Sequence, residues 1–256
     1  MTRETSQTAK MRAEGIDAPR KSRYAAMFSI ELVGPIVFSL SGLLYISFWA
    51  SAASLKSFVG ADASLNQVWN PSQILHILAA TTGLLGTSGV HGLHSPHTGS
   101  WGLLGSAVAL VGQACFFADG VIAYVVFPII AVSDPKALDI DGFMFTGASL
   151  SAYTAFSILH MFGYILLGIT LLVYRRSGAL PHAPLLGMAE SATCALIIGS
   201  ILSHLPPTAG FGLICAGGII WGVGACVLGA LWTRASQINL YSPKTDDAFV
   251  QGQEMA

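Results

Sequence analysis

The residues best suited to chemistry in this chain are a few titratable side chains set inside long apolar stretches. His76, Asp119 and His160 each interrupt a run of hydrophobic residues, and no Lys or Arg lies within those runs to form a fixed ion pair. Ionisable groups at membrane depth are costly, so they usually face a protein interior and mark function. A carboxyl group and two imidazoles in such surroundings could exchange a proton or bind a polar solute.

Six apolar stretches are long enough to carry these residues across a membrane as helices, since a helix needs about 20 apolar residues to cross the hydrocarbon core. The stretches cover about 27–49, 73–93, 101–128, 153–174, 185–205 and 210–232. Charged residues make up only 10% of the 256 residues, against about 25% in a soluble domain. We therefore predict an all-α, polytopic membrane helix bundle with six transmembrane helices, whose main partner is the lipid bilayer.

The distribution of Lys and Arg predicts where the two ends lie. Six of the twelve basic residues precede Tyr24, and with the N-terminus inside, Arg175, Arg176, Arg234 and Lys244 bring the cytoplasmic side to ten. By the positive-inside rule, both termini are predicted to be cytoplasmic. We expect a basic disordered tail over 1–23, the transmembrane domain over 24–233 and a second disordered tail over 234–256.

The charge balance also bears on partners. The formal net charge is −1, and phosphate binding needs concentrated positive charge. We therefore do not expect nucleic acid as a partner.

Estimated depths place three of the titratable residues in one region. Measured from the cytoplasmic end of each span, His76 and Asp119 lie roughly 27 Å up and His160 roughly 21 Å. If the second, third and fourth spans pack together, Asp119 could hold a proton or orient an imidazole. Glu190, roughly 10 Å into the fifth span, and His91, at a similar depth, form a second candidate pair for proton or substrate binding. The alternative for all five is a structural hydrogen bond across the bundle.

A histidine-rich turn is a weaker candidate for a metal site. His91 and His94 are three residues apart and share a helical face until Pro96, and His97 follows at the same spacing. Imidazoles bind transition metals. No Cys or carboxylate stands beside them to complete a tetrahedral set, so an interfacial loop is the preferred interpretation.

Small residues recur at helical spacing in the last span, at Gly218, Gly222, Cys226 and Ala230. Such a stripe lets two helix backbones approach closely, either within one chain or between two copies. We predict a homodimer through this face, with packing inside the chain as the alternative.

Three classes of function are consistent with these features. The leading hypothesis is a small proton-linked permease or transport component for a hydrophobic or small-molecule substrate. Another hypothesis is a non-catalytic membrane accessory protein. No Walker-type loop, GxSxG elbow or HExxH motif is present, which argues against ATP-driven pumps and the common hydrolase classes.

The second hypothesis is a membrane-embedded enzyme or redox protein that acts on a lipophilic molecule. His76 and His160 could be the axial ligands of one b-type haem. This arrangement is similar to that of the six-helix b561-type cytochromes, whose core is a four-helix bundle. The chain departs from that family because a second histidine pair on the third and fifth spans is missing, apart from His204.

Overall fold

The computed structural model describes residues 30–55, 57–173, 183–205 and 210–241, and this part of the chain is helical with short turns and no strand. The long helices are α3 (Ile30–Ala53), α5 (Trp69–Ser133), α6 (Gly147–Val173), α7 (Ala183–Ser203) and α8 (Phe211–Tyr241). Between them lie the short helix α4 (Ala61–Ser64) and two 3-10 turns, η1 (Pro135–Leu138) and η2 (Phe143–Phe145). The predicted all-α class is confirmed.

The two predicted tails fall mostly outside this part of the chain. Residues 1–23 and 242–256 are not among the described residues. At the C-terminal side, α8 continues as a helix to Tyr241, past the predicted boundary at residue 233.

Helix α5 consists of two helices joined by a kink. Gly99 has φ 54° and ψ −150°, a conformation that favours glycine because a Cβ would collide with the backbone. We call residues 69–98 the first arm of α5 and residues 100–133 the second arm.

The two arms pack antiparallel. Near one end of the pair, the indole nitrogen of Trp69 donates a hydrogen bond of 2.9 Å to the carbonyl of Ala123. Near the other end, Nδ1 of His91 lies 3.0 Å from the hydroxyl of Ser106. The first arm therefore runs beside the second from Ala123 to Ser106, and the second arm continues beyond it to Ser133.

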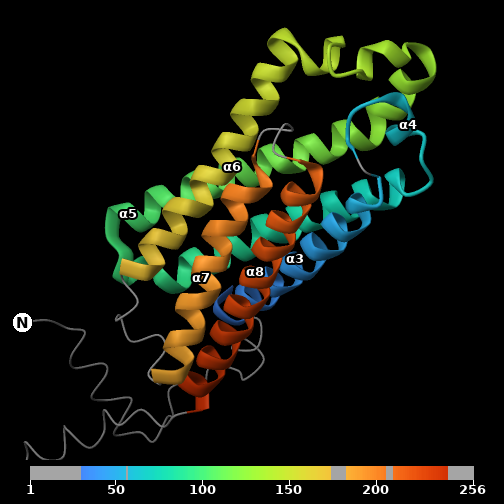
Figure 1. The fold of residues 1–256 in the computed structure, drawn as a ribbon. Helices are drawn as coiled ribbons and strands as arrows, with labels where there is room; N and C mark the ends of the chain where they lie inside the picture. The colour runs from blue at the N-terminus through green and yellow to red at the C-terminus, as the bar shows by residue number, and fades with distance from the viewer. Residues whose placement is uncertain (1–29, 56, 174–182, 206–209, 242–256) are drawn as a thin grey trace, which may run out of the picture.

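The remaining helices complete an antiparallel bundle around this hairpin (Figure 1). Helix α3 packs between the first arm and α8, α8 packs on α7, and α6 packs on the second arm. The packing contact between α6 and α7 is less extensive than the other contacts named here. One end of the bundle holds the kink at Gly99 and the other holds α4, η1 and η2; we call them the Gly99 end and the α4 end.

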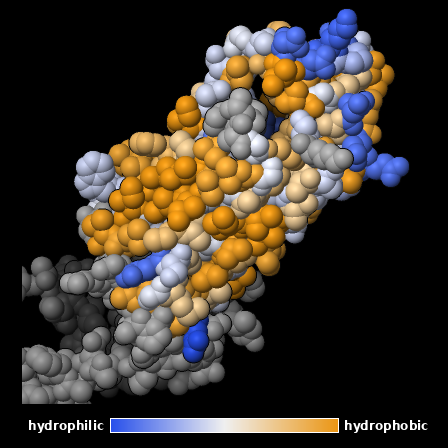
Figure 2. Space-filling model, viewed as in Figure 1, coloured by the Kyte–Doolittle hydropathy of each residue, from blue (hydrophilic) through white to orange (hydrophobic). Residues whose placement is uncertain are grey.

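Five helical segments are long and apolar enough to cross a membrane: Val33–Ala53, Gly99–Ser133, Gly147–Val173, Leu185–Ser203 and Phe211–Ala235. Hydrophobic residues cover much of the visible middle of the bundle, and hydrophilic residues gather at the α4 end (Figure 2). These features indicate a multi-pass integral membrane protein. The predicted second span, 73–93, lies in the first arm and is not among the five, so the described helices support five of the six predicted spans.

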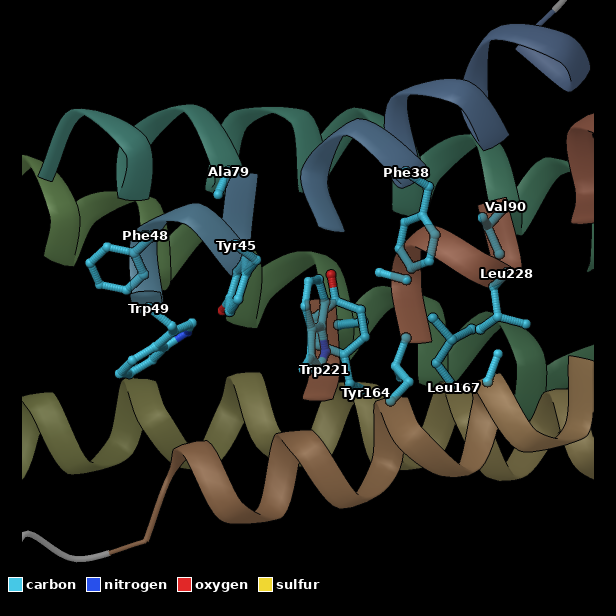
Figure 3. Packing of buried hydrophobic residues seen from close by; sticks show 14 of the residues in the cluster. Phe38, Tyr45, Phe48, Trp49, Ala79, Val90, Tyr164, Leu167, Trp221 and Leu228 are labelled. Carbon is cyan, nitrogen blue, oxygen red and sulfur yellow. The ribbon is translucent and has the colours of Figure 1, made fainter. Parts of the chain in front are cut away.

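Aromatic rings fill the centre of the bundle (Figure 3). The ring of Trp221 lies 4.1 Å from that of Tyr45 and 4.9 Å from that of Tyr164, and Phe38 packs on its other side at 6.3 Å. All four side chains are at most 1% exposed. They tie α3, α6 and α8 together at the level of the site described below.

Small residues bring α3 and α8 into close contact. Gly218 lies against the indole of Trp49, and Gly222 against the backbone of Gly42. The backbone carbonyl of Cys226 accepts a hydrogen bond from the hydroxyl of Ser39.

Gly218, Gly222 and Cys226, three of the four residues that we expected at a homodimer contact, therefore pack within the chain. Gly42 of α3 allows this close approach. Ala230 is the one that remains exposed.

Candidate functional site

His160 of α6 is the centre of a buried hydrogen-bond network. Its side chain is 1% exposed, and its Nε2 lies 2.9 Å from Oε1 of Gln113 and 3.1 Å from the hydroxyl of Tyr45. The hydroxyl of Tyr164 donates to the same Oε1 at 3.0 Å and lies 3.0 Å from the hydroxyl of Thr87. The network thus joins α3, α6 and both arms of α5.

The orientation of Gln113 determines which nitrogen of His160 carries the hydrogen. The amide nitrogen of Gln113 donates to the carbonyl of Ala80 at 3.3 Å, so its Oε1 faces His160. An amide oxygen can only accept. His160 therefore donates from Nε2, and its Nδ1 carries a lone pair. That Nδ1 is buried and has no hydrogen-bond partner among the described residues.

His204, at the end of α7, has its tautomer fixed in the same way. Its Nδ1 lies 2.8 Å from the backbone carbonyl of Ser200, which can only accept, so Nδ1 carries the hydrogen and Nε2 the lone pair. The rings of His204 and His160 are 4.9 Å apart.

His76, in the first arm of α5, is the third imidazole. It is 2% exposed, and its Nδ1 lies 3.2 Å from Oε1 of Gln73. The backbone carbonyl of Phe116 is a further hydrogen-bond partner of its ring. The ring of Phe116 lies 3.8 Å from that of His76 and 4.9 Å from that of His160. We call His76, His160, His204 and Phe116 the histidine cluster.

Two glycines of the second arm make room for this cluster. Gly112 packs against the backbone of His160, and a Cβ at Gly120 would lie 3.1 Å from Cγ of His76. A larger residue at either position would push an imidazole-bearing helix away. The approach of α6 to the second arm therefore depends on glycine at position 112, and the approach of the first arm on glycine at position 120.

Asp119 lies beside the cluster rather than within it. It is half-buried, next to Gly120, and in electrostatic reach of the hydroxyls of Tyr45 and Tyr153. It stands seven residues beyond Gly112, which faces His160, so it is about 10 Å further along the helix. Its carboxyl makes no hydrogen bond to any residue that the structure describes, and its predicted partnership with an imidazole stays a prediction.

The second predicted pair is on helices that do not face one another. His91 lies near the Gly99 end and bonds to Ser106 of the second arm. Glu190 is half-buried in α7, which packs on α6 and α8. The first arm that carries His91 packs instead on α3 and the second arm, so the structure does not bring the two together.

The predicted metal triplet is only partly visible. The side chains of His94 and His97 lie outside the described residues, and His91 is engaged with Ser106. Within the described ranges, no group of three or more His, Cys, Asp or Glu is arranged to hold a metal ion.

The packing of the cluster does not leave room for a haem between the two predicted axial ligands. The ring of Phe116 contacts both His76 and His160, and Nε2 of His160 is occupied by Gln113. A porphyrin would have to displace Phe116 and break the Gln113 bond. These residues, as packed, do not fit a b-type haem.

Several members of the network were not among the residues selected from the sequence. Gln113, Gln73, Tyr45 and Tyr164 carry the hydrogen bonds, and His204 was named only in the comparison of histidine pairs with the b561-type cytochromes. A signal was present, because Gln73 and Gln113 are the only Asn or Gln in the six apolar runs. A buried amide costs free energy unless it is bonded, so these two positions mark the polar interior.

Comparisons with known proteins do not add a name to this arrangement. No protein-family model, no curated protein and no solved structure matches the chain. The interpretation of the site therefore rests on its own geometry.

Proposed function

We propose that the chain is a small proton-linked permease or transport component, and that the histidine cluster binds its solute or passes its proton. The supporting observation is Nδ1 of His160, a buried ring nitrogen that has no partner among the described residues. An unsatisfied buried polar atom costs about 1–3 kcal/mol. Such atoms are uncommon, and a functional role is one of the reasons for which they persist.

The proposal includes six membrane crossings with the first arm of α5 as the second. Its support is the antiparallel pairing of the two arms from Trp69 with Ala123 to His91 with Ser106. Because the second arm is apolar enough to cross, a partner that runs beside it at the same level crosses with it. The basic residues of the sequence favour an orientation with both ends in the cytoplasm.

The two other classes of function lead to different expectations. A redox protein needs a cofactor between the imidazoles, where Phe116 now packs. An accessory protein needs no unpartnered imidazole at all, and substitutions in its core would change stability alone. The transport hypothesis is preferred because neutral imidazoles in a row can accept and release protons without a fixed ion pair.

The test is transport by the purified full-length chain in vesicles. Uptake of radiolabelled methylammonium, urea and formate is measured together with the pH inside the vesicles, for the wild type, His160→Asn and Cys194→Ser. Cys194 is exposed on α7 and is the matched control.

We expect the wild type and the Cys194 variant to move at least one of these solutes faster than protein-free vesicles do, with an accompanying change of internal pH. The His160 variant should lose that uptake while remaining monodisperse. The proposal fails if the wild type moves none of the three, or if His160→Asn transports as well as the wild type.

A further inference from the structure

The unpartnered ring nitrogen of His160 is a hydrogen-bond acceptor. Because Gln113 takes the hydrogen on Nε2 of neutral His160, the free nitrogen, Nδ1, presents a lone pair. The His76 ring has the backbone carbonyl of Phe116 as a hydrogen-bond partner, so it is not counted as a free acceptor. A ligand that satisfies Nδ1 of His160 must bring an N–H or O–H donor.

The charge distribution around the cluster favours a cation. The rings of Phe48 and Phe116 lie 4.6 Å and 3.8 Å from that of His76, and Tyr45 stacks on Phe116 at 5.0 Å, so these rings cover one another's faces. No Lys or Arg occurs in the apolar runs to oppose a cation.

The approach from the α4 end carries the same preference. Asp62, Asp134, Asp139 and Asp141 are exposed there, against Lys136 as the one basic residue that the structure describes at this end. Asp119 lies beside the cluster at the level of His76, half-buried and without a described hydrogen bond. Acidic groups around an opening raise the local concentration of cations.

The bundle is also open on this side. None of the residues 147–159 in the first half of α6 is buried, and α7 ends at Ser203, so it does not cover them. A gap in the surface is visible near the α4 end, and hydrophilic residues lie beyond it at the tip of that end (Figure 2). His160 and His204 lie where α6 and α7 first meet below this opening.

From these features we infer that the solute of the proposed transporter is a cation with N–H donors, for which methylammonium serves as the probe, and that it enters from the α4 end. The inference rests on the proposed function. One feature points the other way: the indole nitrogens of Trp49 and Trp221 are donors without a described acceptor. The lone pair of His160, the carboxyl of Asp119 and the acidic end outweigh them, because all three disfavour an anion.

The inference is tested by competition in the same vesicles. Uptake of radiolabelled methylammonium is measured with an excess of guanidinium, tetramethylammonium, urea or formate. Guanidinium should compete because it is a cation with N–H donors. Tetramethylammonium should compete at least roughly tenfold less well, because it has the charge but cannot donate to an imidazole lone pair.

Two variants locate the effect. Asp119→Asn should weaken methylammonium uptake by roughly tenfold, the loss of one charge-assisted contact, while Cys194→Ser should leave it unchanged. Tyr45→Phe, which keeps the ring and removes the hydroxyl next to Nε2 of His160, provides a second variant of wild-type shape in case a histidine variant is unstable. We expect it to retain guanidinium competition with reduced uptake.

Specific outcomes overturn the inference while leaving the proposed function intact. If the wild type takes up urea or formate in a His160-dependent manner and does not take up methylammonium, the solute is not a cation. Equal competition by tetramethylammonium and guanidinium would show that the imidazole lone pair does not select the solute. Absence of uptake for every solute would instead remove the proposed function itself.

Discussion

The two arms of α5 have similar lengths and meet opposite environments. The first arm carries Gln73, His76 and Thr87, all at most 2% exposed, and packs on α3 and on the second arm. The second arm has the highest mean hydropathy of the candidate spans, 2.2, and the smallest buried share, 17%. Its outer face presents side chains such as Val125 and Ile129, 49% and 63% exposed, to the lipid.

This difference shows what hydropathy measures in a small bundle. An apolar sequence identifies helices that face lipid, because lipid accepts only apolar side chains. A helix enclosed by other helices can carry polar residues, provided that they are bonded to one another. The first arm, which contributes Gln73, His76 and Thr87 to the site, is thus the arm that looks least like a membrane span.

The largest expected effect concerns whether the first arm crosses the membrane, because a labelled position is reached either from one side or from the other. Asn70 and Ser100 are exposed at its two ends. In a chain without its four native cysteines, Asn70→Cys and Ser100→Cys should react with an impermeant maleimide from opposite sides of the membrane. Reaction of both from one side would mean that the first arm does not cross.

Loss of the close contact between the first arm and α3 should prevent folding. Gly89 lies against the backbone of Gly34, and a Cβ at either position meets main-chain atoms. Because backbone cannot move aside as a flexible side chain can, Gly89→Leu should abolish the monodisperse peak in size-exclusion chromatography. Gly212→Leu, where nothing lies within 4 Å of an added Cβ, is the control and should purify normally. Normal behaviour of both variants would contradict this packing.

Removing the amide that joins the two arms should cost less but remain severe. Gln113→Leu leaves His160 and Tyr164 without their shared acceptor, and we expect a loss of about 3 kcal/mol in the free energy of unfolding. Thr81→Val changes an exposed first-arm residue whose hydroxyl bonds only its own helix and should cost less than about 0.5 kcal/mol. Thermal unfolding in detergent measures both. Similar midpoints for the two variants would mean that the network does not hold the arms.

The smallest effect is expected on the outer face of the second arm. Val125 is 49% exposed, and Val125→Leu replaces one lipid-facing side chain with another of similar character. The unfolding midpoint should stay within the error of the wild type, a change below about 0.5 kcal/mol. A clear destabilisation would indicate that this face packs against a protein partner instead of lipid.

The sequence was sufficient for the helical class and for most of the spans, because long apolar runs leave few alternatives to membrane helices. It also placed His76 and His160 correctly inside such runs, as residues that lipid would not tolerate. The pairing of those histidines with Gln73 and Gln113 could not be predicted, since it depends on which helix faces which. The small-residue stripe shows the same limit: Gly222 could serve a dimer or α3, and only the fold decides.

Asp119 illustrates a different difficulty. Counting residues along each span correctly put it at the level of His76, because Gly120 faces that ring. Level alone does not fix the direction of a side chain around its helix. Neighbouring residues of a helix point about 100° apart. Gly120 faces the imidazole of His76, and Asp119, one residue earlier, is near the hydroxyls of Tyr45 and Tyr153 instead.

The most direct test of the account is the hydrogen position on His160 in the membrane. Nitrogen-15 NMR of histidine-labelled protein in vesicles distinguishes a protonated ring nitrogen from one that carries a lone pair, and the His160→Asn variant assigns the signal. The account requires Nε2 of His160 to be protonated and Nδ1 to be bare, with the Nδ1 signal shifting when methylammonium is added. A protonated Nδ1 that does not respond would contradict the site on which the proposed transport rests.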